Sequence, residues 1–300
     1  MLVRNIFKMI AILVVMALPA YSNASEKLDA PESTSDPVSV AYGNNAAAGN
    51  YADVNGIKIY YEIYGSGAPL VLIHGNGDSI AGLAAQIDYF SKYYKVIVAD
   101  SRGHGKSGLG TDQLTYSQMM EDWHELLKAL NVKKAKIFGW SDGGILGLLM
   151  AIKYPENIDK LAIMGANLRP DETAVYSWVQ PILTQARAHV EEMIVQKDSS
   201  NDWGLQIQLL TLLTTQPNID VKSLQQIKLP VLVMAGDRDV IKEEHTLEIF
   251  QNLQNAHLAI LPGNTHFAPV NDSVKFNALL NVFFKNPFTK PSTEALMADH

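Results

Sequence analysis

The stretch that decides the fold is residues 134–154, KAKIFGWSDGGILGLLMAIKY. It opens with an apolar run at residues 135–140, which predicts a short buried strand. After GWSDG at positions 139–143, apolar side chains recur at helical spacing until Pro155. The stretch therefore predicts a strand, a sharp turn with a serine at its apex, and a helix.

A serine in this setting matches the pattern G-x-S-x-G, in which a nucleophilic hydroxyl projects from a strained turn. The residues two before and two after the serine come close together there, so Gly139 and Gly143 leave room that a Cβ atom would fill. Because the helix starts at Ser141, free backbone N–H groups should lie beside the reacting oxygen. The alternative is a glycine-rich turn that only packs a helix on a sheet, and catalytic partners elsewhere in the chain would decide between the two.

Length and composition favour one large α/β domain with room for an inserted subdomain, because the 300 residues are 47% hydrophobic and 18% charged. The net charge of −7, without a basic stripe, argues against a nucleic-acid partner. The lack of cysteine excludes disulfides, thiolate zinc sites and cysteine nucleophiles. Buried strands alternate with helices along the chain, which predicts a mainly parallel twisted sheet with helices on both faces.

Residues 1–24 have the pattern of a signal peptide. Arg4 and Lys8 precede an apolar core at residues 9–18, which is shorter than the roughly 20 residues of a membrane span. Small residues follow and predict cleavage after Ala24, which would make the protein secreted or periplasmic with no stable membrane anchor. The alternative is an uncleaved anchor.

The rest of the chain divides by composition and pattern. Residues 25–50 are rich in Ser, Pro, Asp and Asn and predict a disordered linker. Residues 169–228 hold helical patterns, at residues 175–195 and 203–214, without a convincing strand, and such a segment is too long for a plain crossover. We therefore expect a helical cap at residues 169–228, a core at residues 51–168 and 229–290, and a tail at residues 291–300.

A serine hydroxyl becomes a good nucleophile when a base takes its proton and a carboxylate orients that base. In a parallel sheet such groups gather on loops at the carboxyl ends of strands. Asp239 lies just past the predicted strand at residues 231–235, and His266 lies just past the one at residues 258–261. Asp237 is a rival acid in the first of these loops.

Over residues 51–285, the sequence resembles the α/β-hydrolases. The segments that carry the resemblance are the His74-Gly75 loop, DSRGHGKS at residues 100–107, GWSDGG at 139–144, GDRD at 236–239, and His266. The resemblance implies a triad in the chain order of that family, formed by Ser141, Asp239 and His266. In the family pattern Gly-x-x-Asp the acid stands three after the glycine, which selects Asp239 over Asp237. The sequence departs from the family at Thr265, where members often have glycine directly before the histidine.

An oxyanion hole needs two backbone N–H groups aimed at the developing negative charge. The residue after the serine offers Asp142, and the residue after His74-Gly75 offers Asn76. The carboxylate of Asp142 suits the first turn of a helix, where the dipole favours an acid. The Ser-Asp-Gly-Gly form of the turn also resembles hydrolases of amino-acid esters, in which this carboxylate would bind a substrate ammonium.

We therefore expect a serine hydrolase that acts on a small carboxylic ester through an acyl-enzyme, with no metal or organic cofactor. An amidase or aminopeptidase, a lactonase and an aminoacyl-ester hydrolase fit the same three residues. Outside the enzymes, the alternative is a catalytically silent binding protein of this fold. Such proteins typically lack one of the three triad residues, and this chain has all of them.

Overall fold

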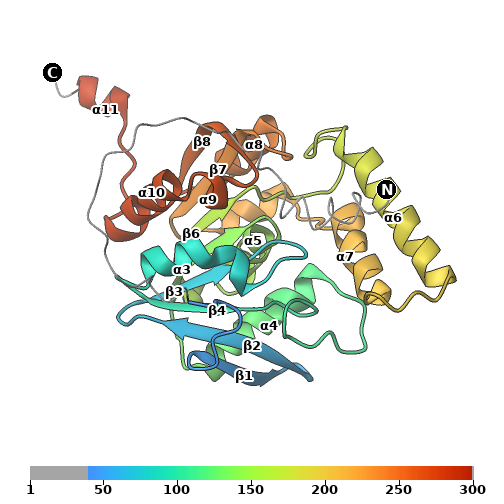
Figure 1. Ribbon diagram of the computed structural model, residues 1–300. Coiled ribbons are helices and arrows are strands. Elements are labelled where there is room, and N and C mark those ends of the chain that lie inside the picture. Colours follow the sequence, from blue (N-terminus) through green and yellow to red (C-terminus); the bar gives the residue numbers. More distant parts are fainter. Residues whose placement is uncertain (1–39, 299–300) are drawn as a thin grey trace, which may run out of the picture.

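An eight-stranded sheet forms the centre of the computed structural model, which describes residues 40–298 (Figure 1). The strand order is β1-β2-β4-β3-β5-β6-β7-β8, with β2 antiparallel to β1 and β4 and the other neighbours parallel. The predicted mainly parallel sheet is confirmed. The strands are β1 Gly49–Val54, β2 Ile57–Tyr64, β3 Pro69–Ile73, β4 Lys95–Ala99, β5 Ala135–Trp140, β6 Ile158–Met164, β7 Val231–Arg238 and β8 Ala256–Thr265.

Helices cover both faces of this sheet (Figure 1). One face packs against α3, α9 and α10, and the opposite face packs against α4, α5 and α8. The helices of these two layers are α3 Ala84–Phe90, α4 Tyr116–Ala129, α5 Asp142–Lys153, α8 Glu243–Asn252, α9 Ala268–Asn271 and α10 Ser273–Lys285. The short helices are η1 Ile80–Leu83, η2 Pro155–Asn157, η3 Val221–Gln226 and α11 Thr293–Ala298.

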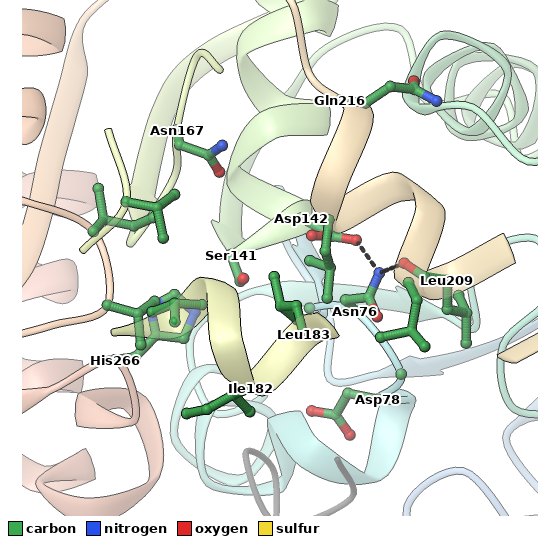
Figure 2. Close-up of a pocket in the computed structure, with 18 of the residues that line it drawn as sticks. Asn76, Asp78, Ser141, Asp142, Asn167, Ile182, Leu183, Leu209, Gln216 and His266 are labelled. Atoms are coloured by element: carbon green, nitrogen blue, oxygen red, sulfur yellow. Dashed lines mark hydrogen bonds between the residues drawn. The ribbon is translucent and has the colours of Figure 1, made fainter. Parts of the chain in front are cut away.

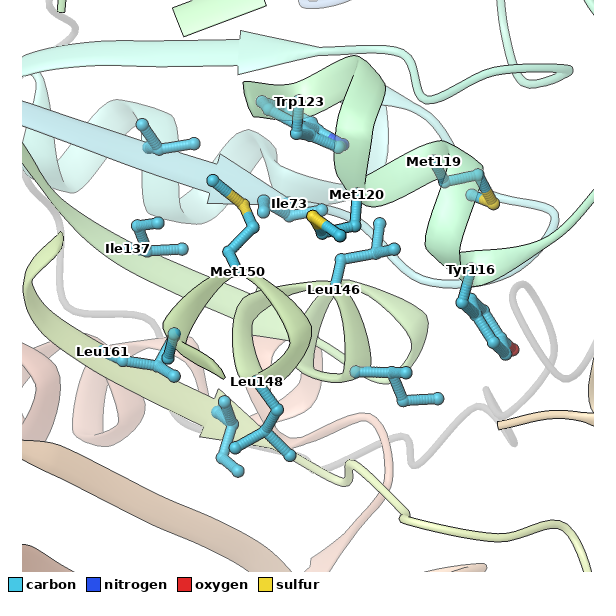
Figure 3. Packing of buried hydrophobic residues seen from close by; sticks show 14 of the residues in the cluster. Ile73, Tyr116, Met119, Met120, Trp123, Ile137, Leu146, Leu148, Met150 and Leu161 are labelled. Atoms are coloured by element: carbon cyan, nitrogen blue, oxygen red, sulfur yellow. The ribbon is translucent and has the colours of Figure 1, made fainter. Parts of the chain in front are cut away.

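Successive side chains of the central strands enter opposite layers of the core, as the pleat of a strand requires. In β5, Ile137 packs beneath α4 and α5, while its neighbour Phe138 packs against α10. Figure 3 shows the first layer, with Ile137 of β5 and with Leu146 and Met150 of α5 among its buried side chains. Because both faces are covered, these strands read as continuous apolar runs without a polar alternation.

Two helices between β6 and β7, α6 Val179–Val195 and α7 Trp203–Thr215, pack on each other beside the sheet (Figure 1). They occupy the region predicted as the cap. The helical pattern was expected from residue 175, but Val175 forms an isolated antiparallel bridge with Ile241, and the helix begins at Val179. The segment entering this region is thereby paired with the chain that follows β7.

The expected linker at residues 25–50 is wrong in its last part. Strand β1 begins at Gly49, and the backbone N–H groups of Gly43 and Asn45 donate to the buried carboxylate of Glu62. A buried carboxylate is costly without such donors, so these residues are held against the sheet. The signal peptide at residues 1–24 and the linker up to residue 39 lie outside the described residues. Within residues 40–298, no helix is long and apolar enough to cross a membrane.

Candidate active site

Ser141 stands at the turn between β5 and α5 with φ 55° and ψ −118°. This positive φ is unusual for a residue with a side chain and marks a strained backbone. A Cβ atom on Gly139 would lie 2.1 Å from the carbonyl oxygen of Gly143, and one on Gly143 would lie 2.2 Å from that of Ile73. The prediction that both positions need glycine is confirmed.

Asp239 and His266 each follow one of two neighbouring parallel strands, β7 and β8. His266 Nδ1 donates to Asp239 Oδ1 at 2.6 Å. Asp239 is buried and also accepts from the backbone N–H groups of Ile241 and Gly236. Asp237 Oδ1, in contrast, has no hydrogen-bond partner within residues 40–298. Of the two candidate acids, the structure brings Asp239 to the histidine.

The electrostatics of this pair keep the acid charged and make the histidine more basic. Burial raises the pKa of Asp239, but the His266 charge, its hydrogen bond and two backbone N–H groups outweigh burial and hold that pKa below its usual range. Burial lowers the pKa of His266, but the Asp239 carboxylate outweighs it, with a further contribution from Asp142. The net result is a His266 pKa above the ordinary 6.5.

Two residues that the sequence analysis did not single out hold His266 in place. Trp140 Nε1 donates to the backbone oxygen of His266 at 2.8 Å, so the serine turn supports the histidine loop directly. Gly165 has φ +63°, and a Cβ atom there would lie 2.6 Å from the imidazole ring of His266. The glycine at the end of β6 was the available signal, because a side chain at this position would displace the ring.

Ser141 and His266 line one pocket under α6 and α7, together with Asn76 and Asp142 (Figure 2). The hydroxyl of Ser141 makes no hydrogen bond within residues 40–298, and such bonds commonly tighten only when substrate is present. The side chains that the helices α6 and α7 contribute to the pocket wall are mainly aliphatic. They include Val179, Ile182, Leu183, Leu209, Leu210 and Leu213.

The two expected oxyanion donors, Asn76 and Asp142, come together beside Ser141 in this pocket. Asp142 is the first residue of α5, so its backbone N–H has no partner inside the helix. Its buried carboxylate accepts from Tyr116 Oη at 2.8 Å and from Asn76 Nδ2 at 3.0 Å. Burial raises the pKa of Asp142 to about 6, although these two hydrogen bonds act in the opposite direction. The sequence pattern had not singled out Tyr116 as a partner of Asp142.

A model of the α/β hydrolase fold matches residues 68–218, which is more than half of the chain. The chain belongs to the α/β hydrolase fold family. This α/β hydrolase is 27% identical over 247 residues to the serine hydrolase BPHL of Mus musculus, covering 77% of this chain and 84% of that relative. It is also 27% identical over 252 residues to a putative carbamate hydrolase, RutD, of Caulobacter sp. strain K31. That match covers 73% of this chain and 93% of the relative.

Solved structures share the fold of this α/β hydrolase. An enol-lactonase from Burkholderia xenovorans LB400 superposes with a TM-score of 0.66 at 22% identity, covering 79% of this chain and all of that chain, 100%. An α/β hydrolase from a Medee basin deep-sea metagenome library gives a TM-score of 0.71 at 20% identity, covering 81% of this chain and 100% of that chain. The relatives matched over most of the sequence are named as hydrolases, and the chain is a hydrolytic enzyme of this family.

The other histidines of the α/β hydrolase nearest to this region have structural surroundings. His74 Nε2 accepts from the backbone N–H of Ser101, and His104 Nδ1 pairs with the backbone oxygen of Arg102. Burial lowers the pKa of His74 to about 4 and that of His104 to about 3, so both are neutral at pH 7. Across residues 40–298, no group of three or more histidine, aspartate or glutamate side chains could hold a metal ion.

Proposed function

We propose that this α/β hydrolase is a serine hydrolase that cleaves carboxylic esters through an acyl-enzyme, with Ser141, His266 and Asp239 as its triad. One observation carries the proposal: a strained Ser141 opens into the same pocket as His266, whose other ring nitrogen is bonded to buried Asp239. This arrangement supports a nucleophile, a base and an orienting acid of the kind that acyl transfer requires.

In the proposed reaction, Ser141 Oγ attacks the ester carbonyl carbon while His266 Nε2 takes the hydroxyl proton. Asp239 holds the opposite ring nitrogen, which fixes the tautomer and stabilises the imidazolium. The tetrahedral intermediate collapses, and the imidazolium gives its proton to the departing alkoxide. Water then attacks the acyl-enzyme with the same proton transfers, which releases the carboxylic acid and restores Ser141.

The negative oxygen of each tetrahedral intermediate would be bound by the backbone N–H groups of Asn76 and Asp142. The loss of one such donor typically costs about 2.7–4 kcal/mol of transition-state stabilisation. The dipole of α5 adds to this, because Asp142 begins that helix and its N-terminus favours negative charge.

The aliphatic wall formed by α6 and α7 supports an apolar group on the substrate. Burial of one CH₂ group contributes about 0.8 kcal/mol, so an alkyl group of the substrate that fills the pocket would gain affinity with each added carbon. We propose that the substrate is a small ester with an apolar acyl or alcohol group.

Relatives named for carbamate hydrolysis and a structural neighbour named as an enol-lactonase use the same fold for other bonds. A panel of p-nitrophenyl esters, matched anilides, carbamates, lactones and aminoacyl esters would test the proposal on the purified chain. We expect turnover of the esters to exceed that of the anilides, and Ser141→Ala to remove it. Hydrolysis of lactones or carbamates with no measurable ester turnover would contradict the ester assignment while leaving the serine mechanism in place.

A further inference from the structure

The side chains of the two proposed oxyanion donors are bonded to each other. Asn76 Nδ2 donates to Asp142 Oδ2 at 3.0 Å, drawn as a dashed line in Figure 2. The residues are 66 positions apart in sequence. One lies in the loop after β3 and the other begins α5, so a single side-chain contact joins the two backbone segments that carry the donors.

This contact is anchored at both ends by further hydrogen bonds. Asp142 Oδ1 accepts from Tyr116 Oη of α4 at 2.8 Å. Asn76 Nδ2 also donates to the backbone oxygen of Leu209 in α7 at 3.3 Å (Figure 2). Asp142 and Tyr116 are each 2% exposed, so water has little access to the carboxylate. The Asn76–Asp142 pair therefore connects α4, α5, the loop after β3 and α7.

A role limited to the helix start would not require this arrangement. An acid in the first turn of a helix gains from the dipole while its side chain faces solvent. Here the carboxylate is buried and takes one donor on each oxygen from two other elements. Burial of a charge is unfavourable without such partners, so the hydrogen bonds from Asn76 and Tyr116 offset part of the cost of burying this carboxylate.

We propose that Asn76 and Asp142 are positioning residues, whose side-chain bond sets the spacing of the two oxyanion donors and ties it to α7. The inference rests on the proposed acyl transfer. Oxyanion donors act when they lie about 2.7–3.1 Å from the developing charge, so a shift of one loop weakens transition-state binding more than substrate binding. Loss of the pair should therefore lower kcat and leave KM nearly unchanged, whatever the charge of the substrate.

The test exchanges the two side chains. In Asp142→Asn one amide oxygen replaces two carboxylate oxygens, so it can no longer accept from both Asn76 and Tyr116. In Asn76→Asp two carboxylates would face each other. In the double variant Asn76→Asp/Asp142→Asn, the position-142 amide donates to the position-76 carboxylate, and its oxygen still accepts from Tyr116. Leu209 loses its donor in the double variant, which leaves the α7 connection broken.

With a neutral p-nitrophenyl ester, we expect each single variant to lose about tenfold or more in kcat, below the 10²–10³-fold loss of a missing donor. KM should stay within about threefold, and the double variant should recover part of the lost kcat. Tyr116→Phe, which keeps the ring and removes one donor, should show a smaller loss in kcat alone. Losses that multiply in the double variant, or that fall on KM, would overturn the proposal.

Asn277→Asp is the matched control, because it changes another buried amide that bonds Gln86 between α10 and α3, outside the pocket. It should lower thermal stability and leave the kcat of the folded enzyme unchanged. Ser141→Ala separates this inference from the proposed function. If the wild type lacks esterase activity or the alanine variant keeps it, the function fails; if activity depends on Ser141 and the exchange shows no recovery, the positioning role fails.

Discussion

His266 Nδ1 and Asp239 Oδ1 lie 2.6 Å apart, although 27 positions separate the two residues in sequence. The parallel pairing of β7 with β8 makes this contact, because each residue follows the end of its strand. The rival Asp237 lies within β7, two positions before Asp239, and its Oδ1 atom is unpartnered among residues 40–298. The acid that can orient the histidine is therefore Asp239.

Asp239→Asn should lower kcat by about 10⁴-fold, since the amide favours the wrong tautomer of His266 and cannot stabilise its charged form. Steady-state kinetics with one p-nitrophenyl ester measures this. Asp237→Asn is the matched control and should stay near wild type. A large loss in the Asp237 variant with little loss in the Asp239 variant would reverse the assignment.

The pH dependence of kcat/KM should report the raised pKa of His266. The base must be neutral to take the proton, so activity should rise with pH and reach half its plateau above the ordinary value of 6.5. Asp239→Asn removes the main effect that raises this pKa, so the residual activity should titrate at lower pH. A profile between pH 5 and 9 checks both points, and an acid limb that Asp239→Asn leaves in place would contradict them.

Asp142→Ala should reduce kcat/KM equally for an α-aminoacyl ester and for its deaminated counterpart. Both oxygens of Asp142 already accept hydrogen bonds, from Tyr116 and Asn76. The ratio of the two losses is the measurement. A ratio near one fits positioning. A selective loss with the amino ester would show that this carboxylate binds a substrate ammonium, since truncating one member of a buried charge pair costs about 2–5 kcal/mol.

The local parts of the site could be predicted from sequence, because strand, turn and helix around Ser141 are set within a few residues. The glycines at 139 and 143 carry that signal, and their close contacts in the structure explain it. Thr115 likewise caps α4 as its pattern indicates, accepting from the Gln118 backbone N–H. Such features depend on backbone geometry, which sequence spacing encodes.

The contacts between distant segments could not be predicted in the same way. The bonds of Asp142 to Asn76 and Tyr116 depend on how α4 and the loop after β3 pack against α5. The bridge of Val175 to Ile241 replaces the first turn of an expected helix. There the backbone hydrogen-bonding groups pair with a neighbouring segment instead of within a helix. Helical periodicity alone cannot distinguish these two outcomes.

The mature protein should begin near Ser25 and be found outside the cytoplasm, as the apolar core at residues 9–18 and the small residues before Ala24 indicate. Intact-mass analysis of the protein from fractionated cells of its native host checks this. Substitution of Ala24 by a bulky residue should impair cleavage. A mass that retains residues 1–24, recovered in the membrane fraction, would contradict the prediction.

The central claim is that Ser141 is the nucleophile, and a fluorophosphonate probe tests it most directly. The wild-type enzyme should gain the mass of one phosphonyl group, and peptide mapping should place it on Ser141. Ser141→Ala should neither label nor hydrolyse esters, while its thermal unfolding stays close to that of the wild type. Labelling of the folded alanine variant at the wild-type rate would contradict the account.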